Sequence, residues 1–152
     1  MDYSGYNLAV LQLTLHDLAY RTHANIQRSH GNTIANLNGK LRDLSQLNRL
    51  LTESQPSGSA LLSLHHNLID RIRLASKDVL CDSNTYHWST PQSIQAQTDR
   101  IKEKIHEYSQ EINLLYTKMG QKEKDMSEVS QAFTDMLKQQ TELIRRILQA
   151  MT

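Results

Sequence analysis

The sequence has little cysteine, proline, glycine or aromatic content. Its 152 residues include one Cys, two Pro, five Gly, one Trp and one Phe. Cys81 alone cannot form an intramolecular disulfide, so the fold does not depend on oxidation. A buried thiol and an intermolecular disulfide are the two alternatives for this residue. Because Gly and Pro are scarce and helix-tolerant residues are abundant, we expect the chain to be nearly all α.

The sequence also lacks an excess of either charge and any long apolar run. The formal net charge is +1, and both signs are mixed along the chain, which argues against nucleic acid or an anionic membrane as the main partner. No apolar run reaches the ~18 residues of a membrane span, and residues 1–21 lack the features of a cleaved secretory signal. We therefore expect a chain that stays in the cytoplasm or leaves by a route reading an uncleaved N-terminus.

A hydrophobic repeat between residues 94 and 150 is the most informative pattern that is present. Apolar residues recur in alternating steps of four and three, which is the heptad period of a coiled coil. The repeat is interrupted at Thr98, Lys122 and Gln140. It predicts a seam, a row of side chains along which one helix packs on another, formed by Ile101, Ile105, Tyr108, Ile112, Leu115, Met119, Met126, Val129, Phe133, Met136, Leu143 and Ile147.

The positions of Gly, Pro and other helix-breaking residues predict one helical domain over residues 1–152. We expect an elongated hairpin or bundle that ends in a long coiled-coil helix. Gly31 and Asn32 interrupt the N-terminal part and indicate either two helices or one bent helix. The expected segments are an N-terminal helical part at about 6–52, a loop at 53–59, a helix at 60–80, a loop at 81–90 and the long helix at 91–150.

The long helix has a recognisable start and one weak point. Pro91 suits a first helical turn, with Ser89 or Thr90 as the N-cap and Gln92 completing a capping box with Ser89. Gly120 costs about 1 kcal/mol relative to Ala in a helix interior, so we expect any bend there.

No constellation of residues predicts catalysis, a cofactor or a metal site. His16, His23 and His30 recur every seven residues, but helical neighbours at that spacing lie ~10 Å apart, too far to share a metal ion. Glu103, Glu107 and Glu111 follow one another at i+4, which is typical of a solvated face. Phosphate-binding Gly loops and nucleophile motifs are missing, so we expect a protein that is not an enzyme.

Tyr86 and Trp88 belong to the only aromatic cluster, in the loop expected before the long helix. Trp in a small helical protein commonly plugs the end of a bundle, and the other interpretation is an anchor for a partner. Tyr86 and Trp88 therefore join Leu137, Ile144 and Leu148, which lie just outside the strict seam, as candidate contacts with another subunit.

The segment from Met119 to Met151 resembles the C-terminal helix of type III secretion needle-tip proteins and of EspA-like filament subunits. The shared sequence pattern consists of the pair Gln121 and Lys122, an apolar-Ser-acidic triplet at residues 126–128, Phe133, and a terminal apolar run that includes Ile144 and Leu148. The resemblance implies export without a cleaved signal and a role as a secreted structural subunit. Tip proteins of that family are about twice as long and carry a globular insertion, so it points to a minimal tip, a filament-like subunit or another small exported component.

These patterns leave three hypotheses open. In the first, the chain is a non-enzymatic component of a type III secretion apparatus at the bacterial surface, which associates with itself or with other subunits of the apparatus. In the second, it is a cytoplasmic chaperone or adaptor that holds an export substrate in an apolar groove. In the third, it is a coiled-coil scaffold of another system. None of the three requires a cofactor.

Overall fold

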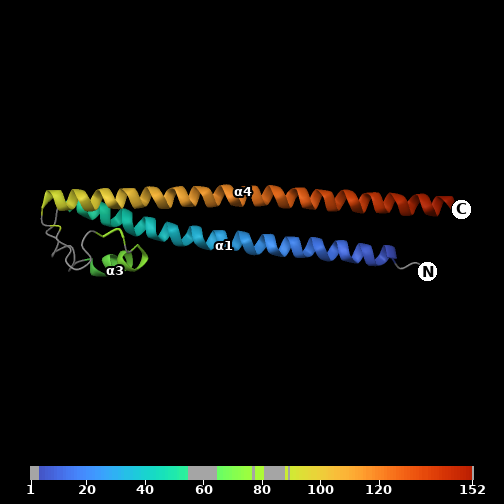
Figure 1. Cartoon of the computed structure of the whole chain (residues 1–152), viewed down its shortest axis with the longest axis horizontal. Helices are drawn as coiled ribbons and strands as arrows, with labels where there is room; N and C mark the ends of the chain where they lie inside the picture. Colours follow the sequence, from blue (N-terminus) through green and yellow to red (C-terminus); the bar gives the residue numbers. More distant parts are fainter. Residues whose placement is uncertain (1–3, 55–64, 77, 81–87, 89, 152) are drawn as a thin grey trace. The chain divides into compact units, whose positions relative to one another are not determined.

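The chain forms three helices within residues 4–54, 65–76, 78–80, 88 and 90–151, which the computed structural model describes (Figure 1). These are α1 (Ser4–Ser54), α3 (His66–Ala75) and α4 (Pro91–Ala150). All regular secondary structure in these residues is helical, which confirms the all-α class and the long C-terminal helix. No helix in the same ranges combines the length and the hydropathy that crossing a bilayer requires.

Helix α1 runs without interruption through the predicted break at Gly31 and Asn32. The interpretation of this part as two separate helices is therefore wrong. Gly in a helix interior costs about 1 kcal/mol, whereas burying a Leu or Ile side chain contributes about 1.5–3 kcal/mol. Ile34, Leu37 and Leu44 follow directly and are all buried, so packing outweighs the local weakness.

Contacts within the chain divide it into two compact units, and the divisions fall inside α1 and α4. Unit 1 comprises Met1–His30 and Tyr116–Thr152, and unit 2 comprises Gly31–Leu115. The single domain over residues 1–152 stays a prediction.

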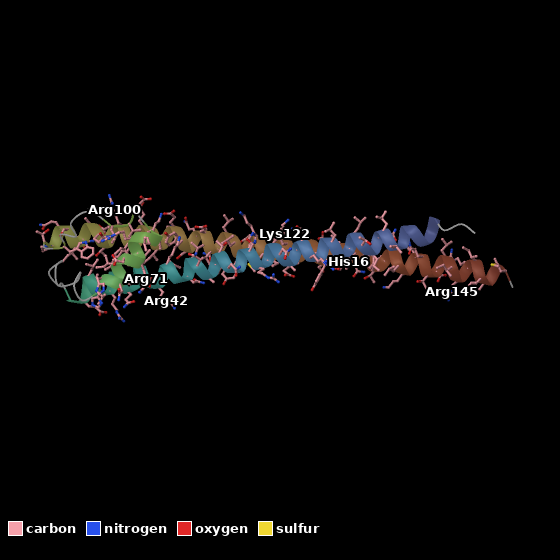
Figure 2. All side chains as sticks on the ribbon, turned by 90° about the horizontal axis from the view of Figure 1, so that it is seen from below. His16, Arg42, Arg71, Arg100, Lys122 and Arg145 are labelled. Atoms are coloured by element: carbon pink, nitrogen blue, oxygen red, sulfur yellow. The ribbon has the colours of Figure 1, made fainter. Side chains whose placement is uncertain are left out.

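Unit 2 has a closed apolar core because three helices contribute to it. Helix α1 supplies Leu44, Leu47 and Leu51, and α3 lies beside this part of α1 (Figure 1). Helix α4 adds Ile101, and α3 adds its apolar face, Leu68, Ile69 and Ile72. On the open side of α3, Arg71 (Figure 2) pairs with Asp43 of α1 at 3.2 Å.

Helix α3 ends at Ala75, earlier than the helix predicted over 60–80. The next residue, Ser76, leaves the helical conformation, and its buried hydroxyl lies 2.6 Å from the Tyr108 hydroxyl of α4. This bond fixes Ser76 against α4, and a turn in which the Val79 N–H donates to the Ser76 carbonyl follows. Residues 60–64, and most of the two predicted loops, 55–59 and 81–87, lie outside the described residues.

Trp88 is buried in unit 2, with 2% of its surface exposed. Its indole N–H donates to the Gln97 side-chain oxygen at 3.4 Å, and the Gln97 amide donates to the Val79 carbonyl at 2.9 Å. The interpretation of Trp88 as an anchor for a partner is therefore wrong, because its ring and its N–H are both used inside the unit. Tyr86 and Cys81 fall outside the described part of the chain.

Helix α4 begins at Pro91 with Thr90 as its N-cap. The Ser93 N–H donates to the Thr90 hydroxyl at 3.1 Å, and the Thr90 N–H donates to the Ser93 hydroxyl at 3.2 Å. This is a reciprocal capping arrangement, so Thr90 is confirmed as one of the two predicted caps. The partner of this cap is Ser93, the third helical position. The other predicted pair, Ser89 with Gln92, includes a residue outside the described part of the chain.

Unit 1 is a pair of helices. Residues 4–30 of α1 run antiparallel to residues 116–150 of α4 (Figure 1). Helix α4 continues through Gly120, where an added Cβ would meet nothing within 4 Å. Because a pair of helices covers only one stripe on each, the other faces of both helices stay open to solvent.

Candidate interaction surface

Unit 1 carries nearly all the large apolar side chains that are exposed in the described residues. Only Leu74 and Leu114 among them belong to unit 2. The others lie on the two helices of unit 1: Val10, Leu11, Leu13, Leu15, Leu18, Tyr20, Tyr116, Val129, Leu137, Leu143, Ile144, Ile147, Leu148 and Met151. Single exposed apolar residues are ordinary, but a concentration of this kind marks an interaction surface.

The contact between the two helices of unit 1 is partly polar. His16 stacks on Phe133 with ring centroids 4.4 Å apart, and its Nε2 lies 3.5 Å from the Ser130 hydroxyl. Further along, the Gln140 amide donates to the Gln12 side-chain oxygen at 3.0 Å. Polar residues at seam positions fix register at a cost in stability, so these contacts select one alignment of the pair.

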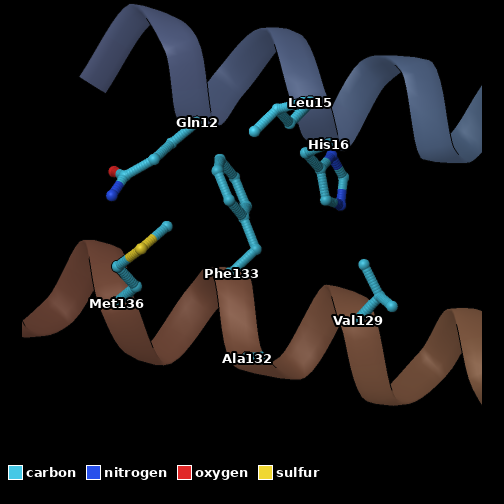
Figure 3. A pocket seen from close by; sticks show the side chains of 7 residues that line it. All are labelled: Gln12, Leu15, His16, Val129, Ala132, Phe133 and Met136. Carbon is cyan, nitrogen blue, oxygen red and sulfur yellow. The ribbon is translucent and has the colours of Figure 1, made fainter. Parts of the chain in front are cut away.

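A shallow groove opens along the contact between the two helices of unit 1, near the small Ala132. Its lining comes from both helices and is largely apolar: Gln12, Leu15, His16, Val129, Ala132, Phe133 and Met136 (Figure 3). The hollow has a volume of about 270 Å³. A partner's apolar side chain could therefore insert between the helices of unit 1 without opening them.

Glu123 forms the main polar link near the other end of unit 1. Its carboxylate accepts a hydrogen bond from the Gln27 amide at 2.9 Å and lies 3.2 Å from His23 Nε2. These two contacts, the one from Gln27 first, hold the pKa of Glu123 below its ordinary value of 4.5. Gln27 also donates to the Met119 carbonyl, which joins α1 to the backbone of α4.

The predicted seam residues fall into three groups along α4. Ile101, Tyr108, Ile112 and Met126 are buried, and Ile105, Leu115, Met119, Phe133 and Met136 are half-buried. Val129, Leu143 and Ile147 are exposed, at 44%, 59% and 51%. The chain's own helices thus do not cover the C-terminal end of the seam.

The candidate partner contacts separate in the same way. Leu137, Ile144 and Leu148 are exposed on unit 1, where they are available to a partner. Trp88 is not available to a partner, because its ring is buried and its indole N–H is hydrogen-bonded within unit 2.

Sequence reasoning missed the apolar surface contributed by α1. The signal was present, because Leu11, Leu13 and Leu15 alternate in steps of two, which a helix cannot place on one stripe. Two-step spacing of this kind inside a helix indicates apolar residues on more than one face. Leu13 and Tyr20 are seven residues apart, so they share a face of the helix, and this face is such an additional one.

The candidate chemical groups are not brought together into a site. His16 and His23 contact different residues of α4, and the glutamates at 103, 107 and 111 are exposed along α4. Lys104 pairs with Glu107 at 2.7 Å, and chiefly this hydrogen bond raises the Lys104 pKa above its ordinary value. Among the described residues, no group of three His, Cys, Asp or Glu side chains could hold a metal ion.

Comparison with protein-family models, with curated proteins and with solved structures finds no match for this chain.

Proposed function

We propose that the chain is a non-enzymatic structural subunit of a bacterial type III secretion apparatus, which assembles through the helices of unit 1. The observation that carries the proposal is the concentration of exposed apolar side chains on unit 1, whereas unit 2 has a closed core. An assembly subunit needs this division, because one part must fold by itself and another must keep apolar surface for its neighbours.

The magnitude of the exposed surface supports self-association. Covering one half-exposed Leu or Ile contributes on the order of 1 kcal/mol, since full burial contributes about 1.5–3 kcal/mol. Association costs roughly 4–15 kcal/mol in lost freedom of motion and more in side-chain ordering. A single leucine cannot offset that cost, but the thirteen exposed apolar residues of unit 1 other than Tyr116 act over one continuous length of helix pair.

The resemblance to needle-tip and filament subunits supports the secretion context. The resembling segment, Met119–Met151, lies wholly within α4 and unit 1. Its apolar terminal run, which includes Ile144 and Leu148, is the most exposed apolar stretch of α4. The terminal apolar run of the resembling segment is thus available for assembly.

A single substitution tests the assembly proposal. Ile144→Asp should leave helicity intact, because Ile144 is 58% exposed, and should lower self-association by about ten-fold or more, because a charge would be buried in the contact. The readouts are circular dichroism and molar mass by light scattering. Leu74→Asp is the matched control, because Leu74 is an exposed apolar residue of unit 2. If the wild-type chain stays monomeric, or if both variants lower assembly equally, the proposal is wrong.

Export is tested separately. The chain should appear in the culture supernatant of a bacterium with a functional type III apparatus and be retained when that apparatus is inactivated. Equal release from both strains, or retention in both, would contradict the secretion context.

The groove at Ala132 favours the second candidate, a chaperone or adaptor that holds an export substrate. It is open and almost entirely apolar, which suits an amphipathic helix of another protein. A stable complex with one different chain, together with absence from the supernatant, would favour this function over self-assembly.

A further inference from the structure

The apolar surface of unit 1 consists of two unlike flanks, and contacts between α1 and α4 identify them. Gln27 bonds to Glu123, so both lie on the same side of the pair. Residues seven apart share a side of a helix in a coiled coil. Flank A therefore contains Leu13 and Tyr20, which precede Gln27 in steps of seven, and Leu137, Ile144 and Met151, which follow Glu123 in such steps, with Leu148 one turn beyond Ile144.

The opposite side of the pair forms flank B. Leu15 lines one groove with Ala132, and Leu18 lines another with Asp125. Asp125 and Ala132 are seven residues apart, so both grooves lie on one side. Flank B therefore contains Leu11, Leu15 and Leu18 of α1 with Val129 and Ala132 of α4.

The area of the two flanks suits a second copy of the chain. The ten large apolar side chains of flanks A and B each expose roughly 60–100 Å², so together they offer on the order of 600–1000 Å². A standard interface buries about 1600 Å² in total, of which roughly 900 Å² is apolar. One flank A placed on one flank B therefore supplies the apolar area of a stable contact.

Charge distinguishes the flanks. Flank B is bordered by an acidic row on α4, in which Glu128 lies four residues before Ala132 and Asp135 three residues after it. Flank A is bordered on α4 by the uncharged Thr134 and Thr141. Lys124 lies four residues before Glu128 and Lys138 three residues after Asp135, so both lysines neighbour the acidic row of the same helix. None of the ion pairs of the described residues includes these four charged side chains.

From these observations we infer that flank A of one copy binds flank B of the next, so that copies add head to tail. The inference rests on the proposed function and gives the geometry of its assembly. Contact between two A flanks would leave the leucines of flank B bare, and contact between two B flanks would bring two acidic rows together. Contact between A and B covers both apolar surfaces and places only one acidic row at the contact.

Head-to-tail contact has a consequence that two-fold contact lacks. Each added copy presents a new flank, so the assembly grows until it closes as a ring or continues as a helical filament. A dimer related by two-fold symmetry stops at two copies.

Two variants with matched exposure test the inference. Ile144→Asp blocks flank A at a residue that is 58% exposed, and Leu18→Asp blocks flank B at one that is 59% exposed. Each variant alone should be a monomer of 17.5 kDa. An equal mixture should form a species of twice that mass, because flank A of the Leu18 variant still fits flank B of the Ile144 variant.

Other outcomes would overturn the inference in recognisable ways. If either variant alone forms a dimer while wild type assembles, contact is two-fold, and the geometry is wrong but the assembly function stands. If the mixture stays monomeric although wild type assembles, the two flanks do not bind each other. A wild-type chain that never assembles would overturn the proposed function as well. Leu148→Asp and Leu11→Asp provide a second pair, and circular dichroism excludes a variant that fails to fold.

Discussion

At the scale of single residues, position relative to the two units decides what a side chain does. Trp88 and Tyr108 are buried in unit 2 and form hydrogen bonds there. Histidines at heptad spacing in unit 1 instead contact different partners, His16 a ring and His23 a carboxylate. Residue type alone did not separate these roles, because each depends on what the opposite helix presents.

The Glu123 carboxylate provides a prediction at this scale. Its pKa should lie below 4.5, mainly because Gln27 donates a hydrogen bond to the ionised form. A lowered pKa means that the contact stabilises the fold at pH values above the ordinary value, and that this contribution is lost as the pH falls through the folded-state pKa. Side-chain carbon chemical shifts measured against pH give the value directly.

Gln27→Ala is the informative variant in that titration. It should move the Glu123 pKa back toward its ordinary value, since the larger of the two contacts is removed, while the His23 contact stays. A Glu123 pKa unchanged by Gln27→Ala would contradict the assigned cause.

At the scale of helices, local signals set the ends and packing sets the continuity. Pro91 and the Thr90 cap start α4 where the sequence indicates. In the middle of α1, Gly31 fails to end the helix because the buried residues that follow offset its cost. Helix α3 ends early because Ser76 bonds to Tyr108, a contact distant in sequence that no local pattern contains.

The cap of α4 can be tested by one substitution. Thr90→Ala should destabilise the chain by about 1 kcal/mol, because the Ser93 N–H loses its acceptor. Chemical denaturation measures the change. Thr141→Ala is the control, since the Thr141 hydroxyl donates to the Leu137 carbonyl within α4 and caps no helix end, so that this substitution should not destabilise the chain. Equal effects of the two substitutions would show that Thr90 does not act as a cap.

Gly120 gives a prediction of opposite sign. Gly120→Ala should stabilise α4 by up to about 1 kcal/mol, because Ala is the better helix former and the added Cβ has open space. Thermal unfolding at a concentration below assembly provides the measurement. A loss of stability would mean that α4 requires Gly120 for a bend, the place where the sequence predicts one.

At the scale of the whole chain, the sequence predicted the helical class and the long seam but not the unequal closure of the two units. The heptad pattern is equally strong at Ile101 and at Ile147, yet Ile101 is fully buried and Ile147 is half exposed. The difference arises because α3 completes the core of unit 2, while unit 1 has two helices. Periodicity shows which face of a helix is apolar, but it contains no information on how many helices cover that face.

This difference predicts unequal hydrogen exchange. Below the assembly concentration, amides around Leu44–Leu51 in unit 2 should exchange about ten-fold or more slowly than amides around Leu11–Leu18 in unit 1, although both segments are helical. The reason is that opening unit 1 exposes little new apolar surface. Equal protection in the two segments of α1 would show that unit 1 is as stable as unit 2.

The mass of the wild-type chain as a function of concentration, measured by sedimentation equilibrium, tests the central claim most directly. If the exposed surface of unit 1 serves assembly, the average mass rises above 17.5 kDa with concentration and continues beyond twice that value. A mass of 17.5 kDa at every concentration would contradict the account.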